Sequence, residues 1–116
     1  NNRVTSTNDP TAHAEVVAIR NACANLGTFQ LEGCIVYTSC EPCPMCLGAI
    51  YWSRPAAIFY AGTQIDAAAA GFDDEEFYKE IEKPNAERQL PMQNLLREEA
   101  QKVFRAWTEK PDKTAY

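Results

Sequence analysis

The stretch CIVYTSCEPCPMCLGAIYW, residues 34–52, joins a short strand pattern to three cysteines at three-residue spacing. Residues 34–38 are rich in β-branched and aromatic side chains, which predicts a buried strand leading directly into the cysteines. Pro42 and Pro44 suit the first turn of a helix, where a missing backbone N–H costs nothing, and the helix pattern continues to Arg54. The apolar face of this helix is expected to hold Leu47, Ile50 and Tyr51.

Helical and strand patterns alternate on either side of this stretch. Helices are predicted at residues 11–26, 65–70 (as a turn or short helix), 74–82 and 98–110, a second strand at 57–61, and a possible edge strand at 89–95. The inward side chains are expected to be Ala14, Val17, Ala18 and Cys23 in the first helix and Val103, Ala106 and Trp107 in the last. This alternation predicts an α/β fold, a three-layer α/β/α sandwich with a mixed sheet.

Length and charge restrict the class of protein. A chain of 116 residues with 46% hydrophobic content is expected to form one domain, residues 1–116. The net charge is −5, and the first 72 residues carry only three cationic side chains, Arg3, Arg20 and Arg54. Tight binding to nucleic acid needs clustered Lys and Arg, so a small or neutral substrate is favoured. Neither a signal peptide nor a membrane span is recognisable, which favours a soluble protein.

The five cysteines favour free thiols over disulfides. The count is odd, and Cys40, Cys43 and Cys46 lie too close together for mutual structural bridges. Free thiols fit a reducing cytoplasm. Cys23 and Cys34 are isolated in apolar surroundings and are expected to pack in the core as small hydrophobic residues.

The single histidine, His13, stands at the start of the first predicted helix, as the cysteines stand at the start of the next. When two strand-to-helix connections run in parallel, both helix N-termini open at the carboxyl end of the sheet, so His13, Cys43 and Cys46 can converge there. One imidazole and two thiolates suit Zn²⁺ and leave its fourth position open for water, which is typical of a catalytic zinc site. Helix N-termini also favour the thiolate form that a metal requires.

Glu15 lies two residues after His13, where its carboxylate can reach water at the metal and act as the proton carrier. The two segments His13-Ala-Glu15 and Pro42-Cys43-Pro-Met-Cys46 match the H-x-E and P-C-x-x-C signature of zinc-dependent base deaminases. The joint match is far more specific than a lone histidine or a lone C-x-x-C.

Cys40 leaves two other interpretations to weigh. An iron–sulfur motif of the C-x-x-C-x-x-C type requires a further cysteine at position 50, which is Ile50. Alternatively, Cys40 could complete a closed zinc site in a structural domain that binds a partner protein, with Glu15 an ordinary helix residue. Packing of Cys40 in the core beside the site is the preferred interpretation.

Residues 8–16, 38–52 and 71–74 together closely resemble the bacterial guanine deaminases, a family with the cytidine-deaminase-like fold, and the resemblance extends over nearly the whole chain. It implies hydrolysis of guanine to xanthine and ammonia. It further implies one Zn²⁺ per subunit held by His13, Cys43 and Cys46, with Glu15 passing protons to the ring and to the departing amino group. A tRNA adenosine deaminase and a guanosine deaminase of the same superfamily are the alternatives.

The resemblance also implies further site residues. Asp74 is expected to be catalytic, against the amino group of the substrate, although it could simply be a favourable acid in the first turn of a helix. Asn2, placed at the end of an expected strand, is expected to recognise the base, or else to form a turn. Trp52 is expected to form a wall of the pocket, or else to pack in the core. The full set implied for substrate binding is Asn2, Ala14, Trp52 and Tyr116.

The resemblance implies an assembly and a location as well. Members of the family form homodimers in which the C-terminal segment, here ending in Tyr116, crosses to the partner and closes its active site. A cytoplasmic enzyme of purine catabolism is implied, with no nucleic-acid or membrane partner. Family members also carry an N-terminal helix and a β-hairpin before the segment where these 116 residues start. If the 116 residues are the whole molecule, we expect an exposed sheet edge and a half-open pocket; if they are an N-terminally incomplete domain of a longer chain, the implied activity stands.

Overall fold

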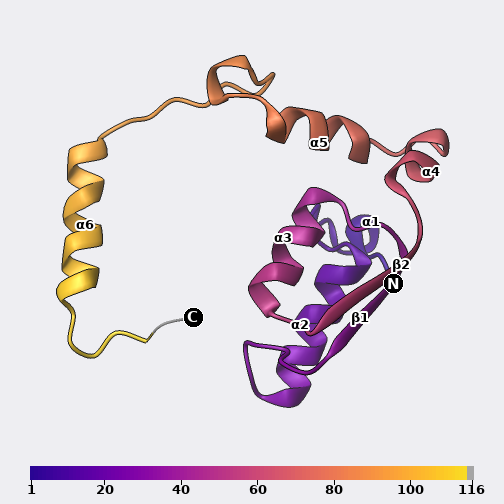
Figure 1. The fold of residues 1–116 in the computed structure, drawn as a ribbon, viewed down its shortest axis with the longest axis horizontal. Helices are drawn as coiled ribbons and strands as arrows, with labels where there is room; N and C mark the ends of the chain where they lie inside the picture. Colours follow the sequence, from indigo (N-terminus) through magenta and orange to yellow (C-terminus); the bar gives the residue numbers. More distant parts are fainter. Residues whose placement is uncertain (115–116) are drawn as a thin grey trace. The chain divides into compact units, whose positions relative to one another are not determined.

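A computed structural model describes residues 1–114 and divides the chain into two compact units, residues 1–82 and residues 83–116. The first unit holds α1 (Val4–Thr7), α2 (Ala14–Leu26), β1 (Ile35–Cys40), α3 (Pro44–Ser53), β2 (Ala57–Gly62), α4 (Gln64–Ala69) and α5 (Asp74–Glu82). The second unit holds the short 3₁₀ helix η1 (Asn85–Glu87) and α6 (Arg97–Glu109). Figure 1 shows this order along the chain.

The centre of the first unit is a β1–α3–β2 crossover. The two strands are parallel neighbours, and their register runs from Ile35 opposite Ala57 to Cys40 opposite Gly62. Parallel strands need a crossover connection, which α3 supplies here. The predicted α/β class is therefore confirmed, and within residues 1–114 the sheet consists of this parallel pair.

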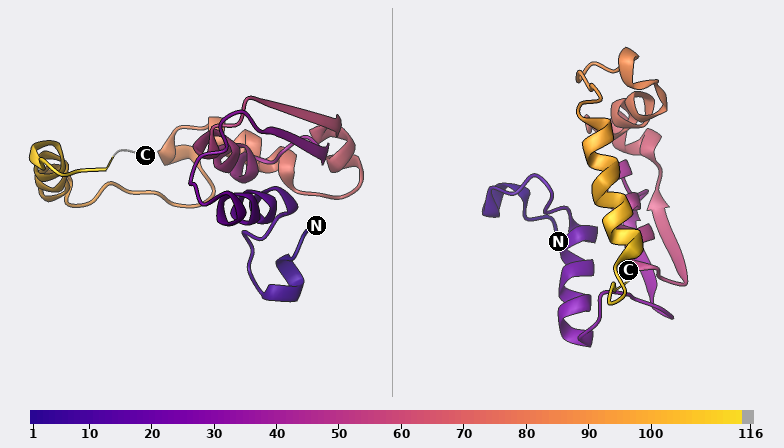
Figure 2. Two further views of the ribbon diagram at one scale, coloured as in Figure 1. Left: turned by 90° about the horizontal axis from the view of Figure 1, so that it is seen from below. Right: turned by 90° about the vertical axis from the view of Figure 1, so that its left-hand side faces the viewer.

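The two faces of the strand pair differ. Figure 2 shows α2 and α3 on the same side of the strands, and Val36, Thr38 and Cys40 alternate toward the less exposed face. On the opposite face, Tyr37 and Phe59 stack with their ring centroids 5.4 Å apart, and Tyr37 is 74% exposed. The prediction of a strand buried throughout was wrong, because in this unit the helices cover one face only.

The helix boundaries follow local chemistry. Gly27 ends α2 with φ of 64°, a left-handed conformation that glycine adopts without a steric penalty. Pro44 occupies the first turn of α3, as predicted. Thr63 begins α4 through a capping box: its side chain accepts from the Asp66 N–H while the Asp66 carboxylate accepts from the Thr63 N–H.

The buried core is small and centred on the cysteine helix. Val16, Cys43 and Cys46 form one buried cluster with Ala49 packed against it, and Ile50 is 1% exposed. Val16, rather than the predicted Val17 or Ala18, is the buried residue of α2. Tyr51 is exposed, so its assignment to the buried face of α3 was wrong, whereas Ile50 was assigned correctly.

The second unit differs from the sequence expectation. Residues 89–95 form no strand; Pro91 lacks a backbone N–H, and the preceding residues form bends. Helix α6 forms close to the predicted bounds, but none of its residues is buried. Val103, Phe104 and Trp107 instead give it an exposed apolar face.

Candidate active site and metal centre

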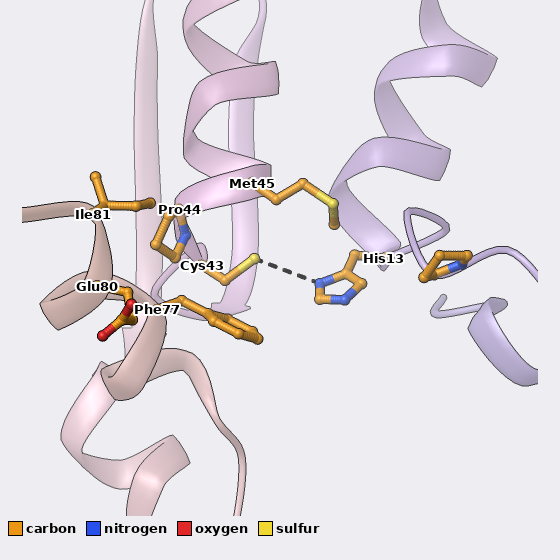
Figure 3. A pocket seen from close by; sticks show the side chains of 8 residues that line it. His13, Cys43, Pro44, Met45, Phe77, Glu80 and Ile81 are labelled. Carbon is orange, nitrogen blue, oxygen red and sulfur yellow. Dashed lines mark hydrogen bonds between the residues drawn. The ribbon is translucent and has the colours of Figure 1, made fainter. Parts of the chain in front are cut away.

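His13 and Cys43 occupy equivalent positions at the starts of α2 and α3. Each is the N-cap residue in an extended conformation, with ψ of 157° for His13 and 165° for Cys43, and neither side chain caps its own helix. Their carbonyl oxygens accept the first helical bonds, from the N–H groups of Val17 and Leu47. Both side chains are thus free to point away from their helices toward each other, as Figure 3 shows.

The three predicted ligands come together. The donor atoms of His13, Cys43 and Cys46 all lie within 4.8 Å of one another, and Cys43 Sγ is 3.6 Å from His13 Nδ1. Tetrahedral zinc with ordinary Zn–N and Zn–S bond lengths places such donors roughly 3.5 Å apart. The two cysteines are buried, with Cys46 only 1% exposed. The residues present therefore fit one Zn²⁺ in both donor chemistry and spacing.

The two thiols are electrostatically unequal in the metal-free chain. The single proton of the Cys46 thiol has both the Cys43 sulfur and Glu15 Oε2 as possible acceptors. Directed at Cys43, and assisted by the Cys46 backbone N–H and the charge of His13, it lowers the pKa of Cys43 to about 6 against the effect of burial. The same hydrogen bond, together with burial, raises the pKa of Cys46. One thiolate is therefore ready for a metal at neutral pH, and the second thiol must lose its proton when the metal binds.

Glu15 lies on the first turn of α2, directly beside this triad. Its Oε2 accepts from Cys46 Sγ at 3.5 Å, and its Oε1 accepts from the Thr38 hydroxyl at 2.8 Å. The carboxylate therefore lies within reach of any molecule held at the triad. Thr38 was not identified by sequence reasoning, although its place at the end of the strand before the cysteines was the available signal.

A cavity of about 540 Å³ opens over the triad, a size typical of small-molecule sites. Besides Cys46 it contains six residues predicted at the site, the first five being Asn2, His13, Ala14, Glu15 and Cys43. Asp74, the first residue of α5, also lines it. The cavity thus gathers residues that lie 72 positions apart in the sequence.

Asn2 is one of the residues that line the cavity. It precedes α1, and its Oδ1 accepts from the Val4 N–H at 2.9 Å, which fixes the turn into that helix. Residues 1–3 lie outside the helices and strands of the structure, and a strand that ends at Asn2 stays a prediction.

Two predicted binding residues are not among the described residues that line this cavity. Trp52 is 64% exposed near the C-terminal end of α3 and does not line the cavity within residues 1–114, so its role as a pocket wall stays a prediction. Tyr116 lies outside the described residues.

Cys40 lies beside the triad without joining it. Its Sγ donates to the Thr63 carbonyl at 3.9 Å, and burial, followed by the charges of Asp74 and Glu15, raises its pKa. The metal group found among the described residues contains His13, Cys43 and Cys46 without Cys40.

A second cavity, of about 410 Å³, lies on another side of His13 and Cys43 (Figure 3). Met45 of α3 and Phe77 and Ile81 of α5 give it a largely apolar lining. Helix α5 is fixed near the metal loop by Tyr78, whose hydroxyl donates to the Pro42 carbonyl at 2.6 Å. Nearby, the Glu41 carboxylate accepts from the Gln64 N–H at 2.9 Å and links the same loop to α4.

A His–Cys–Cys group at two helix N-termini, with a carboxylate beside it in a small-molecule cavity, defines the class of zinc-dependent deaminases. In agreement, the family model of the cytidine and deoxycytidylate deaminase zinc-binding region matches residues 1–62. The chain belongs to this family, and its cofactor is zinc.

Individual relatives narrow the comparison. Guanine deaminase of Bacillus subtilis (strain 168) is 59% identical over 115 residues, which cover 99% of this chain and 74% of that protein. A solved X-ray structure of guanine deaminase from Bacillus subtilis superposes with a TM-score of 0.93, covering 99% of this chain and 73% of that one. The predicted cytidine-deaminase-like fold is thereby confirmed.

Similarity to tRNA deaminases is more limited. The tRNA-specific adenosine deaminase of Aquifex aeolicus (strain VF5) is 47% identical over 60 residues, 52% of this chain and 40% of that protein. A solved structure from a study of tRNA:A34 deaminases has a TM-score of 0.54 and 43% identity, covering 54% of this chain and 46% of that one. This similarity covers about half of the chain, whereas the guanine deaminase similarity covers nearly all of it.

No helix within residues 1–114 is both long enough and apolar enough to cross a membrane.

Proposed function

We propose that this chain is a zinc-dependent guanine deaminase that converts guanine and water to xanthine and ammonia. The observation that carries the proposal is the joint placement of the His13–Cys43–Cys46 triad and Glu15 in one cavity. The 59% identity to a guanine deaminase over nearly the whole chain favours guanine over other bases.

His13, Cys43 and Cys46 hold the zinc, which when bound supplies the activation of a water molecule near neutral pH. Glu15, whose carboxylate lies beside the triad, would take one proton from the attacking water and deliver it to the ring nitrogen. It would then carry the second proton of that water to the amino group, which leaves as ammonia. In the overall reaction a C–O bond forms at C2 of guanine, the C2–N bond to the amino group breaks, and ammonia leaves.

The remaining cavity residues bind the purine. Asn2 recognises the base edge through its amide, and Ala14 lies against the substrate beside Glu15. Asp74 accepts an N–H of the amino group and assists its departure. Trp52 contributes a wall of the completed pocket.

The active form is a cytoplasmic homodimer with exchanged C-terminal segments, in which Tyr116 closes the site of the partner and residues 1–116 belong to a single domain. Two features support exchange. The first unit leaves the Tyr37 and Phe59 face of its sheet exposed, and α6 in the second unit has an exposed apolar face of its own. Each surface needs a covering partner.

Activity is tested by measuring ammonia release from guanine, guanosine, cytosine and an RNA hairpin in parallel. Turnover of guanine with little turnover of the other three supports the proposal. Turnover of the hairpin alone would identify a tRNA deaminase instead.

The proton role of Glu15 is tested by substitution. Glu15→Gln is expected to keep zinc and fold while its rate falls about 10²- to 10⁴-fold, the usual contribution of an acid–base residue. Unchanged turnover in Glu15→Gln contradicts its proton role.

Exchange is tested by complementation between two defective chains. Glu15→Gln chains lack the proton carrier, and Tyr116→Ala chains lack the closing residue. In an exchanged heterodimer, one site combines an intact Glu15 with an intact Tyr116. An equal mixture, refolded together, should regain about a quarter of parent activity, since half the dimers carry one good site of two. Activity equal to the average of the separate homodimers would rule out exchange.

A further inference from the structure

The hydroxyl of Thr38 connects the sheet to Glu15. Thr38 Oγ1 donates to Glu15 Oε1 at 2.8 Å across 23 residues of sequence, and the contact is partly buried. Thr38 lies on β1 opposite Tyr60, on the strand face that alternates toward the helices. A rigid strand, rather than a loop, therefore supplies the donor.

The same hydroxyl has a second acceptor. Thr38 Oγ1 also lies 3.0 Å from the carbonyl oxygen of Cys40, in donating geometry. A threonine hydroxyl carries one proton, so it can donate to only one of the two acceptors at a time. The shorter of the two contacts, at 2.8 Å, is the one to the Glu15 carboxylate.

Glu15 needs such a partner because its side chain is long and has several rotatable bonds. Its other oxygen has the Cys46 thiol as donor, and that proton is lost when the cysteine becomes a metal ligand. Thr38 is then the neighbouring side chain still able to fix the carboxylate. A misplacement of about 1 Å in a reacting group can cost about 100-fold in rate.

On this geometry, and assuming the proton-carrying role of Glu15 given under the proposed function, we propose that Thr38 is a positioning residue for the deamination reaction. It holds the Glu15 side chain toward the triad through the 2.8 Å hydrogen bond to Glu15 Oε1. Thr38 is not among the described residues that line the cavity over the triad, and on this proposal it acts through Glu15.

Two substitutions separate the hydroxyl from the shape of the side chain. Thr38→Val removes the hydroxyl and keeps the volume, and it should lower kcat about 10- to 100-fold with KM changed less than about threefold. Thr38→Ser keeps the hydroxyl and should recover most of that loss. The matched control is Thr108→Val, because the Thr108 hydroxyl donates only to a helix carbonyl in the second unit, and turnover should be unchanged. Equal kcat in the parent and in Thr38→Val overturns the proposal.

A double-mutant cycle tests whether Thr38 acts through Glu15. In the Glu15→Gln background, Thr38→Val should lower the residual rate by much less than it does in the parent. A full additional loss in that background would show a general structural effect and contradict the proposal. Zinc content and the visible spectrum of the Co²⁺-substituted protein should match the parent in every variant.

A measurement independent of turnover completes the test. In chains with glutamate isotope-labelled at the side-chain carboxyl carbon, the Glu15 NMR resonance is identified by its loss in Glu15→Gln. Thr38→Val should shift and broaden that resonance in both zinc-loaded and zinc-free chains, and Thr38→Ser should not. An unaffected resonance refutes the contact. Parent chains that show the NMR effect but turn over none of the four substrates would refute the proposed function and leave the Thr38 contact established.

Discussion

Titration of the zinc-free chain is expected to show a thiolate forming on Cys43 near pH 6. The pKa of this thiol is lowered from 9.0 to about 6, chiefly by the hydrogen bond from Cys46. At pH 7.5 most of Cys43 is then ionised, whereas most of an unperturbed thiol is protonated. The Cys46 thiol stays protonated over this range because its own pKa is raised.

The lowered pKa of Cys43 and the raised pKa of Cys46 determine how the affinity for zinc changes with pH. Above pH 6, binding must displace the Cys46 proton alone, so the two thiols together make affinity fall about tenfold for each unit of pH lowered. Below pH 6, Cys43 is protonated as well, and the fall from the two thiols becomes about 100-fold per unit. Zinc should therefore be lost to a competing chelator much more steeply below pH 6 than above it.

The ultraviolet absorbance of thiolates provides the assay. The difference in thiolate absorbance between the parent and Cys43→Ser, followed across the pH titration, gives the ionisation step of Cys43 alone. Cys46→Ala removes the donor and should move that step up toward pH 9, whereas Cys46→Ser retains a donor and should move it less. A Cys43 step centred above pH 8 in the parent would refute the reasoning.

Three further outcomes are expected. Cys40→Ala should keep one zinc per chain by metal analysis, because the Cys40 thiol donates to a carbonyl outside the triad; loss of zinc would instead support a closed four-ligand site. Tyr78→Phe removes the 2.6 Å hydrogen bond to the Pro42 carbonyl and should lower the free energy of unfolding in urea by about 1 kcal/mol; no change would show that α5 does not depend on it. Ile50→Ala leaves a cavity beneath α3 and should cost about 2 to 5 kcal/mol in the same assay, with a cost below 1 kcal/mol contradicting its central place in the core.

The metal ligands could be predicted because their positions depend on local rules. Pro44 begins α3, and the chain before α2 is extended at His13, so both ligands fall at helix starts. Glu15 followed from its spacing to His13. None of these steps required knowledge of long-range packing.

The wrong predictions from sequence concern features that tertiary contacts determine. Val17 and Val16 fit the helical pattern equally well, and only the position of α3 determines that Val16 is buried. Residues 89–95 have apolar side chains at strand spacing but find no paired backbone within residues 83–114. The roles of Thr38 and Tyr78 could not be foreseen, because their partners lie 23 and 36 residues away in the sequence.

The absence of side-chain caps at His13 and Cys43 has a consequence for the lifetime of the protein. Residues at these positions ordinarily stabilise their own helices, but here both side chains are committed to the ion, which thereby ties two helix starts together. Ligand binding to the native state adds about 2.7 kcal/mol at a free concentration 100 times the dissociation constant. In a cell short of zinc, we therefore expect this protein to be degraded faster as well as to be inactive. The supply of zinc would then govern the amount of the protein in the cell.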